Sequence, residues 1–197
     1  MKLIIVRHGE TEENLARIIQ GHKHGHLSKQ GKEQAKKLAK RLRDEKLDLI
    51  LSSDLGRSSN TTGEINKYHS NVEIKFIKEL REKTAGIYDG KRSEEFHKAR
   101  ENSGLPDEDF KPQKGENNKD VEKRIIKFID KLLEKYPNKT ILLSTHGRWI
   151  KVFIQHYFGI CYSDVETDHT CVYMVELFKD KNHKIHLKNC TKHLENS

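Results

Sequence analysis

The sequence predicts an α/β sandwich with a largely parallel sheet. The first reason is three short apolar runs at residues 2–6, 47–51 and 140–144, because strands buried on both faces carry apolar side chains throughout. The second is that helical patterns separate these runs, and strands that alternate with helices are typical of parallel sheets. No internal repeat and no linker rich in Pro, Gly or Ser divides the chain, so we expect a single domain over residues 1–197.

The N-terminal half is predicted to hold three strands and the start of two helices. After the first strand and a polar loop, Ser28 can cap a helix whose alanines and leucines repeat at helical spacing. The second strand is followed by Ser52-Ser53-Asp54, which supplies helix-starting side chains. Residues 72–77 alternate apolar and polar side chains, as a half-buried strand does.

The C-terminal half is predicted to open with a polar surface excursion near residues 98–119, which carries two glycines and two prolines. A helix follows over residues 121–137, beyond which lies the strand at 140–144. An apolar helix over residues 149–158 is closed by Gly159, since glycine commonly ends helices. Residues 171–178 form the last predicted strand.

The chain is strongly basic, which favours an anionic partner. Its formal net charge is +8 and its pI is about 9.2, with 35% charged and 34% apolar residues. A nucleic acid and a small phosphorylated metabolite are both partners of this kind. Because the lysines are spread along the chain and no nucleic-acid recognition motif accompanies them, we expect the small metabolite and no nucleic acid.

The sequence also predicts a cytoplasmic protein with no membrane partner. No apolar run approaches the length that crosses a bilayer, and the first residues lack the layout of a signal peptide. Cys161, Cys171 and Cys190 are odd in number and form no Cys-x-x-Cys pair, which disfavours a disulfide scaffold or a zinc ribbon. The oligomeric state stays open, with a homodimer among the arrangements allowed.

Two of the predicted strands end in a histidine that is followed by a glycine. His8 follows the first strand, and His146 follows the strand at 140–144. Since ligands bind beyond the carboxyl ends of strands in open α/β sheets, we expect the two histidines to face each other across a pocket. Arg7 would add positive charge there, as would Arg57 in the first turn of a helix, because guanidinium groups and helix N-termini both suit phosphate oxygens.

Four short motifs extend this pattern along the chain. They are Val6-Arg7-His8-Gly9-Glu10-Thr11 with Asn14 and Gln20-Gly21, Ser52-Ser53-Asp54-Leu55 with Arg57, Leu80-Arg81-Glu82 with Gly86 and Gly90, and Thr145-His146-Gly147. In this order they resemble the motifs of the histidine phosphatase (phosphoglycerate mutase-like) superfamily, and Gly115-Glu116 ahead of Arg124 resembles a weaker further block. The resemblance covers nearly the whole chain. It implies a three-layer α/β/α sandwich with a mostly parallel central sheet.

The resemblance also implies a phosphatase that works through a phosphohistidine and needs no cofactor or metal. His8 would be the nucleophile, and Glu82 would be the general acid and later the base. His146 would complete the catalytic set. The residues that would bind the phosphoryl group or the leaving group are Arg7, Asn14, Gln20, Gly21, Arg57 and Gly147.

The same family contains mutases, and two departures favour a phosphatase here. The glycolytic mutases carry Tyr three residues after the catalytic Glu and a longer basic insertion that grips the substrate carboxylate. Here that position is Ala85, whose methyl group leaves space open. The excursion near residues 98–119 is rich in acids, which would repel a bisphosphorylated acid.

The sequence is most similar to the broad-specificity and fructose-2,6-bisphosphatase-like branch, which implies sugar phosphates or related metabolites as substrates. A cofactor-dependent phosphoglycerate mutase and an α-ribazole phosphatase are the alternatives within the family. A phosphate-binding regulatory protein is the non-enzyme alternative, and the intact set of His8, Glu82 and His146 argues against it.

One histidine-rich loop has no assigned role. His22, His24 and His26 alternate along it, and alternating histidines can bind a transition metal. Substrate selection and simple exposure to solvent are the other two interpretations. Because the resemblance implies no metal, we expect none at this loop.

Overall fold

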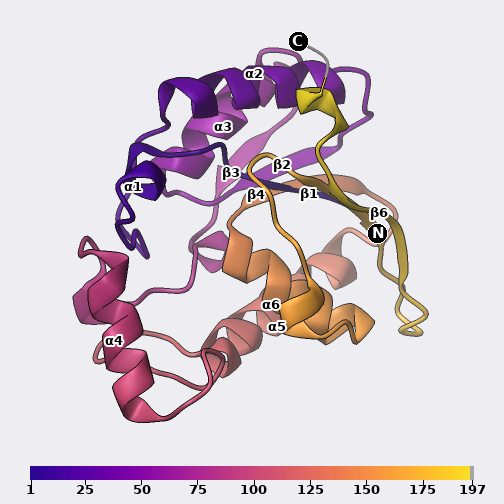
Figure 1. Cartoon of the computed structure of the whole chain (residues 1–197). Helices are drawn as coiled ribbons and strands as arrows, with labels where there is room; N and C mark the ends of the chain where they lie inside the picture. The colour runs from indigo at the N-terminus through magenta and orange to yellow at the C-terminus, as the bar shows by residue number, and fades with distance from the viewer. Residues whose placement is uncertain (196–197) are drawn as a thin grey trace.

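The structure is a computed structural model that describes residues 1–195, and it confirms the predicted fold class. A six-stranded sheet lies between two layers of helices (Figure 1). The strands are β1 (Lys2–Arg7), β2 (Leu49–Ser52), β3 (Ile74–Phe76), β4 (Thr140–Thr145), β5 (Val172–Glu176) and β6 (Lys184–Cys190). The helices are α1 (Glu12–Leu15), α2 (Lys29–Leu42), α3 (Gly56–Asn66), α4 (Ser93–Ser103), α5 (Asn118–Lys135) and α6 (Gly147–Phe158).

The strand order in the sheet is β3-β2-β4-β1-β5-β6. The first four strands in this order are parallel, whereas β5 runs antiparallel to β1 and β6 runs antiparallel to β5. In register, Arg7 of β1 lies opposite Thr145 of β4, and Ser52 of β2 lies opposite Ser144 of β4. The residues that follow β1, β2 and β4 therefore emerge together at one edge of the sheet, where open α/β folds bind ligands.

Each face of the sheet is covered by its own helices, and the alternation of side chains along a strand decides which residues face them. Leu3 and Ile5 of β1 pack in one core with Trp149 of α6 and with α5. Ile4 and Val6 of the same strand pack in the other core, against α2 and α3. Figure 1 shows these two helix pairs on opposite sides of the sheet. Because both faces of β1 are covered in this way, every residue from Leu3 to Val6 has to be apolar.

Several helix ends depend on side chains that lie within a few residues of them. Ser28 Oγ accepts a hydrogen bond from the N–H of Gly31 at 2.9 Å at the start of α2, as predicted. Asn117 and Asp120 form a capping box at the start of α5. Gly159 ends α6 with a φ of 66°, a left-handed conformation that favours glycine.

Several elements differ from the prediction. The excursion near residues 98–119 opens as helix, because α4 extends to Ser103. Phe96 is the only buried residue of α4, so no apolar repeat in the sequence indicates this helix. The strand predicted at 72–77 shortens to the edge strand β3. The sequence pattern also misses α1 and β6, and β6 has no fully buried residue that would mark it as a strand.

No helix among residues 1–195 is both long and apolar enough to cross a bilayer.

The cysteines are free thiols that differ in their exposure to solvent. Cys171 is buried, Cys190 is partly buried and Cys161 is exposed.

Candidate active site

His8 and His146 lie side by side at the carboxyl edge of the sheet. Because Arg7 pairs with Thr145, the residues that follow β1 and β4 come out next to each other. The ring centroids of the two histidines are 5.1 Å apart. Both side chains are buried, with exposed fractions of 3% and 0%. The structure thus brings the two predicted histidines together.

Hydrogen bonds decide which nitrogen of His8 carries the proton. Nδ1 lies 2.7 Å from the carbonyl oxygen of Gly9, which can only accept, so Nδ1–H is the donor. Nε2 is then unprotonated, and it accepts from Arg57 Nε at 3.2 Å. Burial, together with Arg57 and Arg7, holds the pKa of His8 well below its usual 6.5. At neutral pH the imidazole is therefore neutral and has its lone pair on Nε2, as a nucleophile requires.

Arg57 is a buried cation that fastens a loop beside His8. Its side chain makes four hydrogen bonds, one to His8 and the others to the carbonyl oxygens of Gly21, Lys23 and His24. A guanidinium has five N–H groups, so one Nη2–H remains for a bound anion. Burial lowers the pKa of Arg57 to about 10, which keeps it charged at neutral pH.

The same loop is closed on its other side by Asp89. Gly21 has a φ of +47°, and a Cβ there would lie 1.8 Å from Oδ1 of Asp89, so glycine is required. The Asp89 carboxylate accepts from the main-chain N–H groups of His22 and Ala85 and from the hydroxyl of Thr84. Asp89 therefore joins the loop of Gly21 to the loop that follows the predicted acid.

Two buried side-chain nitrogen atoms near His8 have no hydrogen-bond partner among the described residues. They are Arg7 Nε and His146 Nδ1. Ser53 Oγ accepts from the N–H of Leu55 and lies 2.8 Å from His146 Nε2, so Nδ1 is the nitrogen of this imidazole that is left for a ligand. An unpaired buried donor costs about 1–3 kcal/mol. A phosphoryl oxygen bound here would satisfy such donors.

The side-chain amide of Asn14 is held in one orientation, because its carbonyl oxygen accepts hydrogen bonds from neighbouring residues. This orientation leaves the amide N–H groups for a ligand. Oδ1 accepts from the N–H and the hydroxyl of Thr11, at 3.1 and 2.8 Å, and lies 3.2 Å from His169 Nε2. Burial and the nearby Arg7 lower the pKa of His169 to about 4, so this histidine is neutral and its Nε2–H donates. Asn14 lines the cavity, and its side-chain N–H groups make no hydrogen bond within residues 1–195. No motif in the sequence indicates the role of His169.

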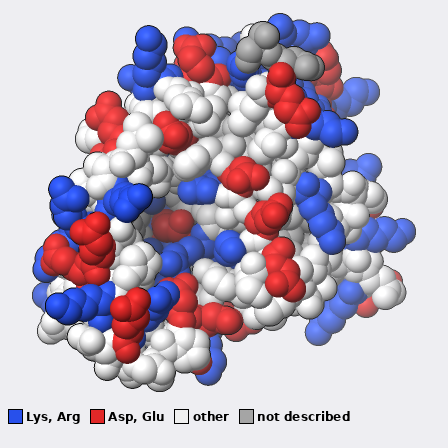
Figure 2. Space-filling model, viewed as in Figure 1, with Lys and Arg blue, Asp and Glu red and all other residues white. Residues whose placement is uncertain are grey.

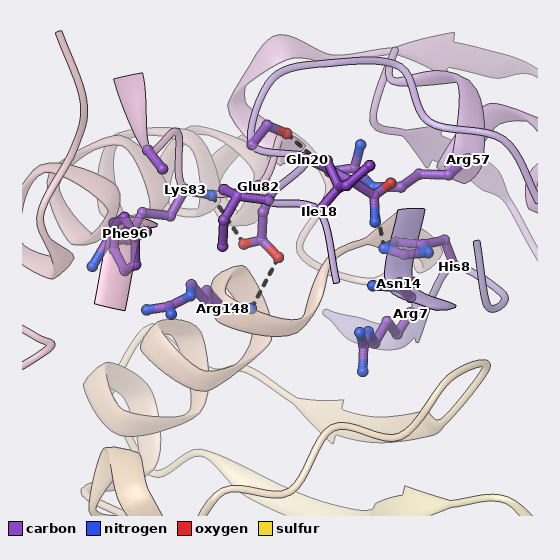
Figure 3. A pocket seen from close by; sticks show the side chains of 13 residues that line it. Arg7, His8, Asn14, Ile18, Gln20, Arg57, Glu82, Lys83, Phe96 and Arg148 are labelled. Atoms are coloured by element: carbon purple, nitrogen blue, oxygen red, sulfur yellow. Dashed lines mark hydrogen bonds between the residues drawn. The ribbon is translucent and has the colours of Figure 1, made fainter. Parts of the chain in front are cut away.

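Glu82 faces His8 from the other side of the cavity (Figure 3). Its carboxylate accepts the main-chain N–H groups of Lys83 at 2.9 Å and of Arg148 at 3.3 Å. Arg124 donates to the carbonyl oxygen of Glu82 at 3.0 Å and forms an ion pair with Glu116. The weaker sequence block thus holds the loop of the predicted acid in place.

Most of the predicted site residues line one cavity of about 180 Å³. Seven of the nine predicted site residues line it, and the other two, His146 and Gly147, adjoin it beside His8 and Arg7. The motifs assign no role to the remaining lining residues, which are Ile18, Ile19, Lys83, Ala85, Phe96 and Arg148. Lys83 and Arg148 each directly follow a motif residue, which is the signal that would have found them. Phe96 belongs to α4, where the sequence carries no such signal.

The acids of the excursion do not line the cavity, so the expected repulsion of a bisphosphorylated acid is wrong. Asp107 forms an ion pair with Arg148 and lies 3.8 Å from Arg100. Glu116 is occupied by Arg124. Figure 2 shows a hollow on the viewed face with both basic and acidic side chains inside it.

The space beside Ala85 is not open either, which corrects a second expectation. Ala85 is 6% exposed and packs with Phe96 and Phe110 in a small apolar cluster. The two phenylalanine rings are 5.5 Å apart. Phe110 of the predicted surface excursion is therefore buried behind the cavity wall that Ala85 and Phe96 form.

The three histidines of the glycine-containing loop have different partners. His22 Nε2 lies 2.9 Å from the carbonyl oxygen of Glu82, so it donates there. His24 Nδ1 accepts a hydrogen bond from the N–H of Gly56, and His26 Nδ1 forms a hydrogen bond with the carboxylate of Glu13 in α1. Within residues 1–195, no three His, Cys, Asp or Glu side chains form a cluster that could hold a metal ion.

Comparison with known proteins identifies the family. Residues 3–191 match the histidine phosphatase superfamily (branch 1). The chain belongs to this family. It is therefore a phosphoric monoester hydrolase, as the resemblance of the motifs implied.

The proteins that are similar to this histidine phosphatase are named for different activities and substrates. It is 32% identical over 162 residues to a broad-specificity phosphatase of Saccharomyces cerevisiae, which covers 79% of this chain and 69% of the relative. It is 31% identical over 157 residues to phosphoglycerate mutase-like protein 4 of Arabidopsis thaliana, covering 76% and 68%. A mutant phosphoserine phosphatase of Entamoeba histolytica, solved with phosphoserine, superposes with a TM-score of 0.83 at 28% identity over 98% of each chain.

Proposed function

We propose that this histidine phosphatase hydrolyses small phosphomonoesters, such as sugar phosphates or related metabolites, through a phosphohistidine at His8. The observation that carries the proposal is the state of His8. Its imidazole is buried and neutral, and its unprotonated Nε2 lies near two buried nitrogen atoms that lack partners among the described residues, Arg7 Nε and His146 Nδ1. Glu82 faces it from across the same cavity.

In the first step, Nε2 of His8 attacks phosphorus while the bond from phosphorus to the ester oxygen breaks. The leaving oxygen takes a proton from Glu82, so the alcohol leaves neutral and Glu82 becomes a carboxylate. Arg7, Arg57 and His146 donate to the equatorial oxygens and offset their charge. The remaining contacts to the phosphoryl group or the leaving group come from Asn14, Gln20, Gly21 and Gly147.

In the second step, water replaces the alcohol. The Glu82 carboxylate takes a proton from water as the water oxygen attacks phosphorus. The bond between phosphorus and nitrogen breaks, and its electron pair returns to Nε2 of His8. Phosphate leaves, and the enzyme is restored with a protonated Glu82 and a neutral imidazole.

We propose that no metal or other cofactor takes part, because Arg7, Arg57 and His146 supply the positive charge and donors that a cation supplies elsewhere. Phosphate release from a simple phosphomonoester is expected to survive EDTA. Vanadate is expected to block it, since vanadate imitates the transferring phosphoryl group and transition-state analogues bind tightly. An enzyme that loses activity in EDTA and regains it with Zn²⁺ or Mg²⁺ would contradict this prediction.

We further propose that water, rather than a phosphoglycerate, accepts the phosphoryl group. Ala85 cannot donate a hydrogen bond to an acceptor acid, and the cavity opens to the surface, so water reaches the phosphohistidine. Phosphate release is expected to exceed exchange between phosphoglycerates by on the order of tenfold, or about 1.4 kcal/mol in barrier. The measurement supplies 3-phosphoglycerate with a trace of 2,3-bisphosphoglycerate and follows 2-phosphoglycerate and free phosphate together. Rapid isomerisation with little free phosphate would instead favour the mutase.

The size of the cavity limits which leaving groups fit. Its volume of about 180 Å³ lies below the roughly 300–1,000 Å³ of pockets for drug-sized ligands, which favours a smaller leaving group than α-ribazole.

We propose a cytoplasmic enzyme whose basic charge serves a small anionic substrate. Binding to random DNA at physiological salt, with the steep salt dependence of backbone contacts, would support a nucleic-acid partner instead.

A further inference from the structure

Asn14 lies on an element that the core does not fix. Helix α1 is four residues long, and none of its residues is buried. Within residues 1–195, its hydrogen bonds join it to residues 11–26 of its own segment, with one exception. The exception connects Asn14 Oδ1 to Nε2 of His169 at 3.2 Å, 155 positions along the chain. His169 therefore ties α1 to the residues that lead into β5.

The direction of this hydrogen bond matters for the side chain of Asn14. Oδ1 can only accept, and the neutral imidazole of His169 donates to it from Nε2. Thr11 binds the same oxygen from within the segment, through its N–H and its hydroxyl. The imidazole of His169 also lies close to the nucleophile, because its ring centroid is 6.2 Å from that of His8. Asn14 is thus held from two sides, and the bond from His169 is the one that refers it to the sheet.

The residue that follows His169 has a strained main chain. Thr170 is fully buried and has a φ of 57°, in the left-handed region that β-branched residues rarely adopt. Such a conformation costs free energy and persists only where the surrounding contacts enforce it. Here the N–H of Thr170 donates to the carbonyl oxygen of His8 at 3.3 Å, and its hydroxyl donates to the carbonyl oxygen of His169 at 2.7 Å. These bonds fix the main chain of His169 beside the nucleophile.

His193 supports this conformation from the C-terminal end of the chain. It belongs to a short 3₁₀ turn, Lys192–Leu194, that packs against α2 (Figure 1). Because the hydroxyl hydrogen of Thr170 is used for His169, His193 Nε2–H is the donor in its 3.1 Å hydrogen bond to Thr170 Oγ1. Burial, together with two cations of α2, lowers the pKa of His193 to about 4, so its imidazole is neutral at pH 7. Hydrogen bonds thus lead from His193 through Thr170 to His169, and from there to Asn14.

The end of β6 holds the same loop at a second point. The N–H of Asp168 donates to Asn189 Oδ1 at 2.9 Å, and Asn189 Nδ2 donates to the carboxylate of Asp168 at 2.7 Å. The residue before Asp168 in turn holds an arginine of the site, because the carbonyl oxygen of Thr167 accepts from Nη1 of Arg7. Residues 167–170 therefore connect the C-terminal segment to the proposed phosphoryl-binding residues.

We propose that His169 is a positioning residue, which orients the amide of Asn14 for the phosphoryl group, and that His193 keeps His169 in place through Thr170. The C-terminal turn then acts on the phosphoryl site without touching the substrate. The proposal rests on the proposed function only for the role of Asn14, since the hydrogen bonds themselves belong to the fold.

Vanadate binding, followed by calorimetry, tests the positioning role, because a dissociation constant does not depend on the fraction of folded protein. His169→Phe keeps a ring but loses the donor, and it is expected to weaken vanadate binding and to lower kcat/KM by about tenfold. His169→Gln restores an N–H at a similar reach and is expected to stay within about threefold of the unmodified enzyme. His186→Phe is the matched control, because His186 is an exposed histidine of β6 that pairs with Glu176, and it is expected to change nothing.

The Asn14→Ala background separates positioning from general damage to the fold. Asn14→Ala by itself is expected to weaken vanadate binding by about 10²-fold, because it removes a donor to the phosphoryl group. In the unmodified background, His193→Phe is expected to weaken vanadate binding by about threefold to tenfold, since it acts at one remove from Asn14. When His169→Phe or His193→Phe is added to Asn14→Ala, a further change of less than about twofold is expected, because residues that act through one group are not additive.

Vanadate binding that is unchanged in His169→Phe, or that His169→Phe still weakens undiminished in the Asn14→Ala background, would overturn the role of His169. An undiminished effect of His193→Phe in that background would overturn the role of the C-terminal turn. Failure of the proposed function has a different signature: the unmodified protein would release no phosphate and form no phosphoenzyme, while the differences in vanadate binding among the variants would remain.

Discussion

Replacing His8 with alanine is expected to abolish the phosphoenzyme and to lower phosphate release by on the order of 10⁴-fold or more, as loss of a nucleophile does in other hydrolases. The physical reason is that alanine leaves the donors of Arg7 and His146 in place but removes the lone pair that attacks phosphorus. His146 Nε2 does not replace it, because this nitrogen is hydrogen-bonded to Ser53 Oγ at 2.8 Å.

The measurement follows labelled phosphate on the denatured protein together with turnover. The label on the unmodified enzyme is expected to be acid-labile and base-stable, as a phosphohistidine is. His156→Ala is the control, because His156 is an exposed histidine of α6 that pairs with Glu122 outside the cavity. Label that persists in His8→Ala on another residue would refute the assignment of the nucleophile.

Replacing Glu82 with glutamine is expected to slow the hydrolysis of alkyl phosphates by about 10²–10⁴-fold, the usual contribution of a general acid or base. Glutamine keeps the shape and can still accept from the N–H of Arg148, but it has no proton to give to the leaving oxygen. An aryl phosphate such as p-nitrophenyl phosphate needs no such proton, because nitrophenolate is a good leaving group. The first step should therefore be nearly normal with this substrate.

With p-nitrophenyl phosphate, the Glu82→Gln enzyme should release a burst of nitrophenol and then accumulate phosphoenzyme, since the base for the water step is also missing. Glu79→Gln is the control, because its exposed carboxylate lies in the same segment while only its carbonyl oxygen bonds Arg124 and Trp149. An equal loss of rate with alkyl and aryl phosphates, without a burst, would show that Glu82 does not act as the acid.

Much of the fold could be predicted from the sequence because its causes are local. The central strands follow from short apolar runs, and the ends of α2 and α6 follow from Ser28 and Gly159. The candidate site was also largely indicated by motifs, since the register of β1 and β4 brings His8 next to His146 whenever both strands form. By contrast, α4 and β6 carry too few buried residues to leave a pattern in the sequence.

The sequence by itself determined the central strands, the main helices, the ends of α2 and α6 at Ser28 and Gly159, and the residues proposed for the chemistry. Only the tertiary structure decided the electrostatics around the cavity. From the sequence, Asp107 is expected to repel an anionic substrate. In the fold it forms an ion pair with Arg148, which lies 41 positions away in the chain. Phe96 and Phe110 likewise fill the space beside Ala85, although their sequence neighbours are polar. The physical reason is that periodicity and capping act within a few residues, whereas charge neutralisation and packing depend on which side chains meet across the fold.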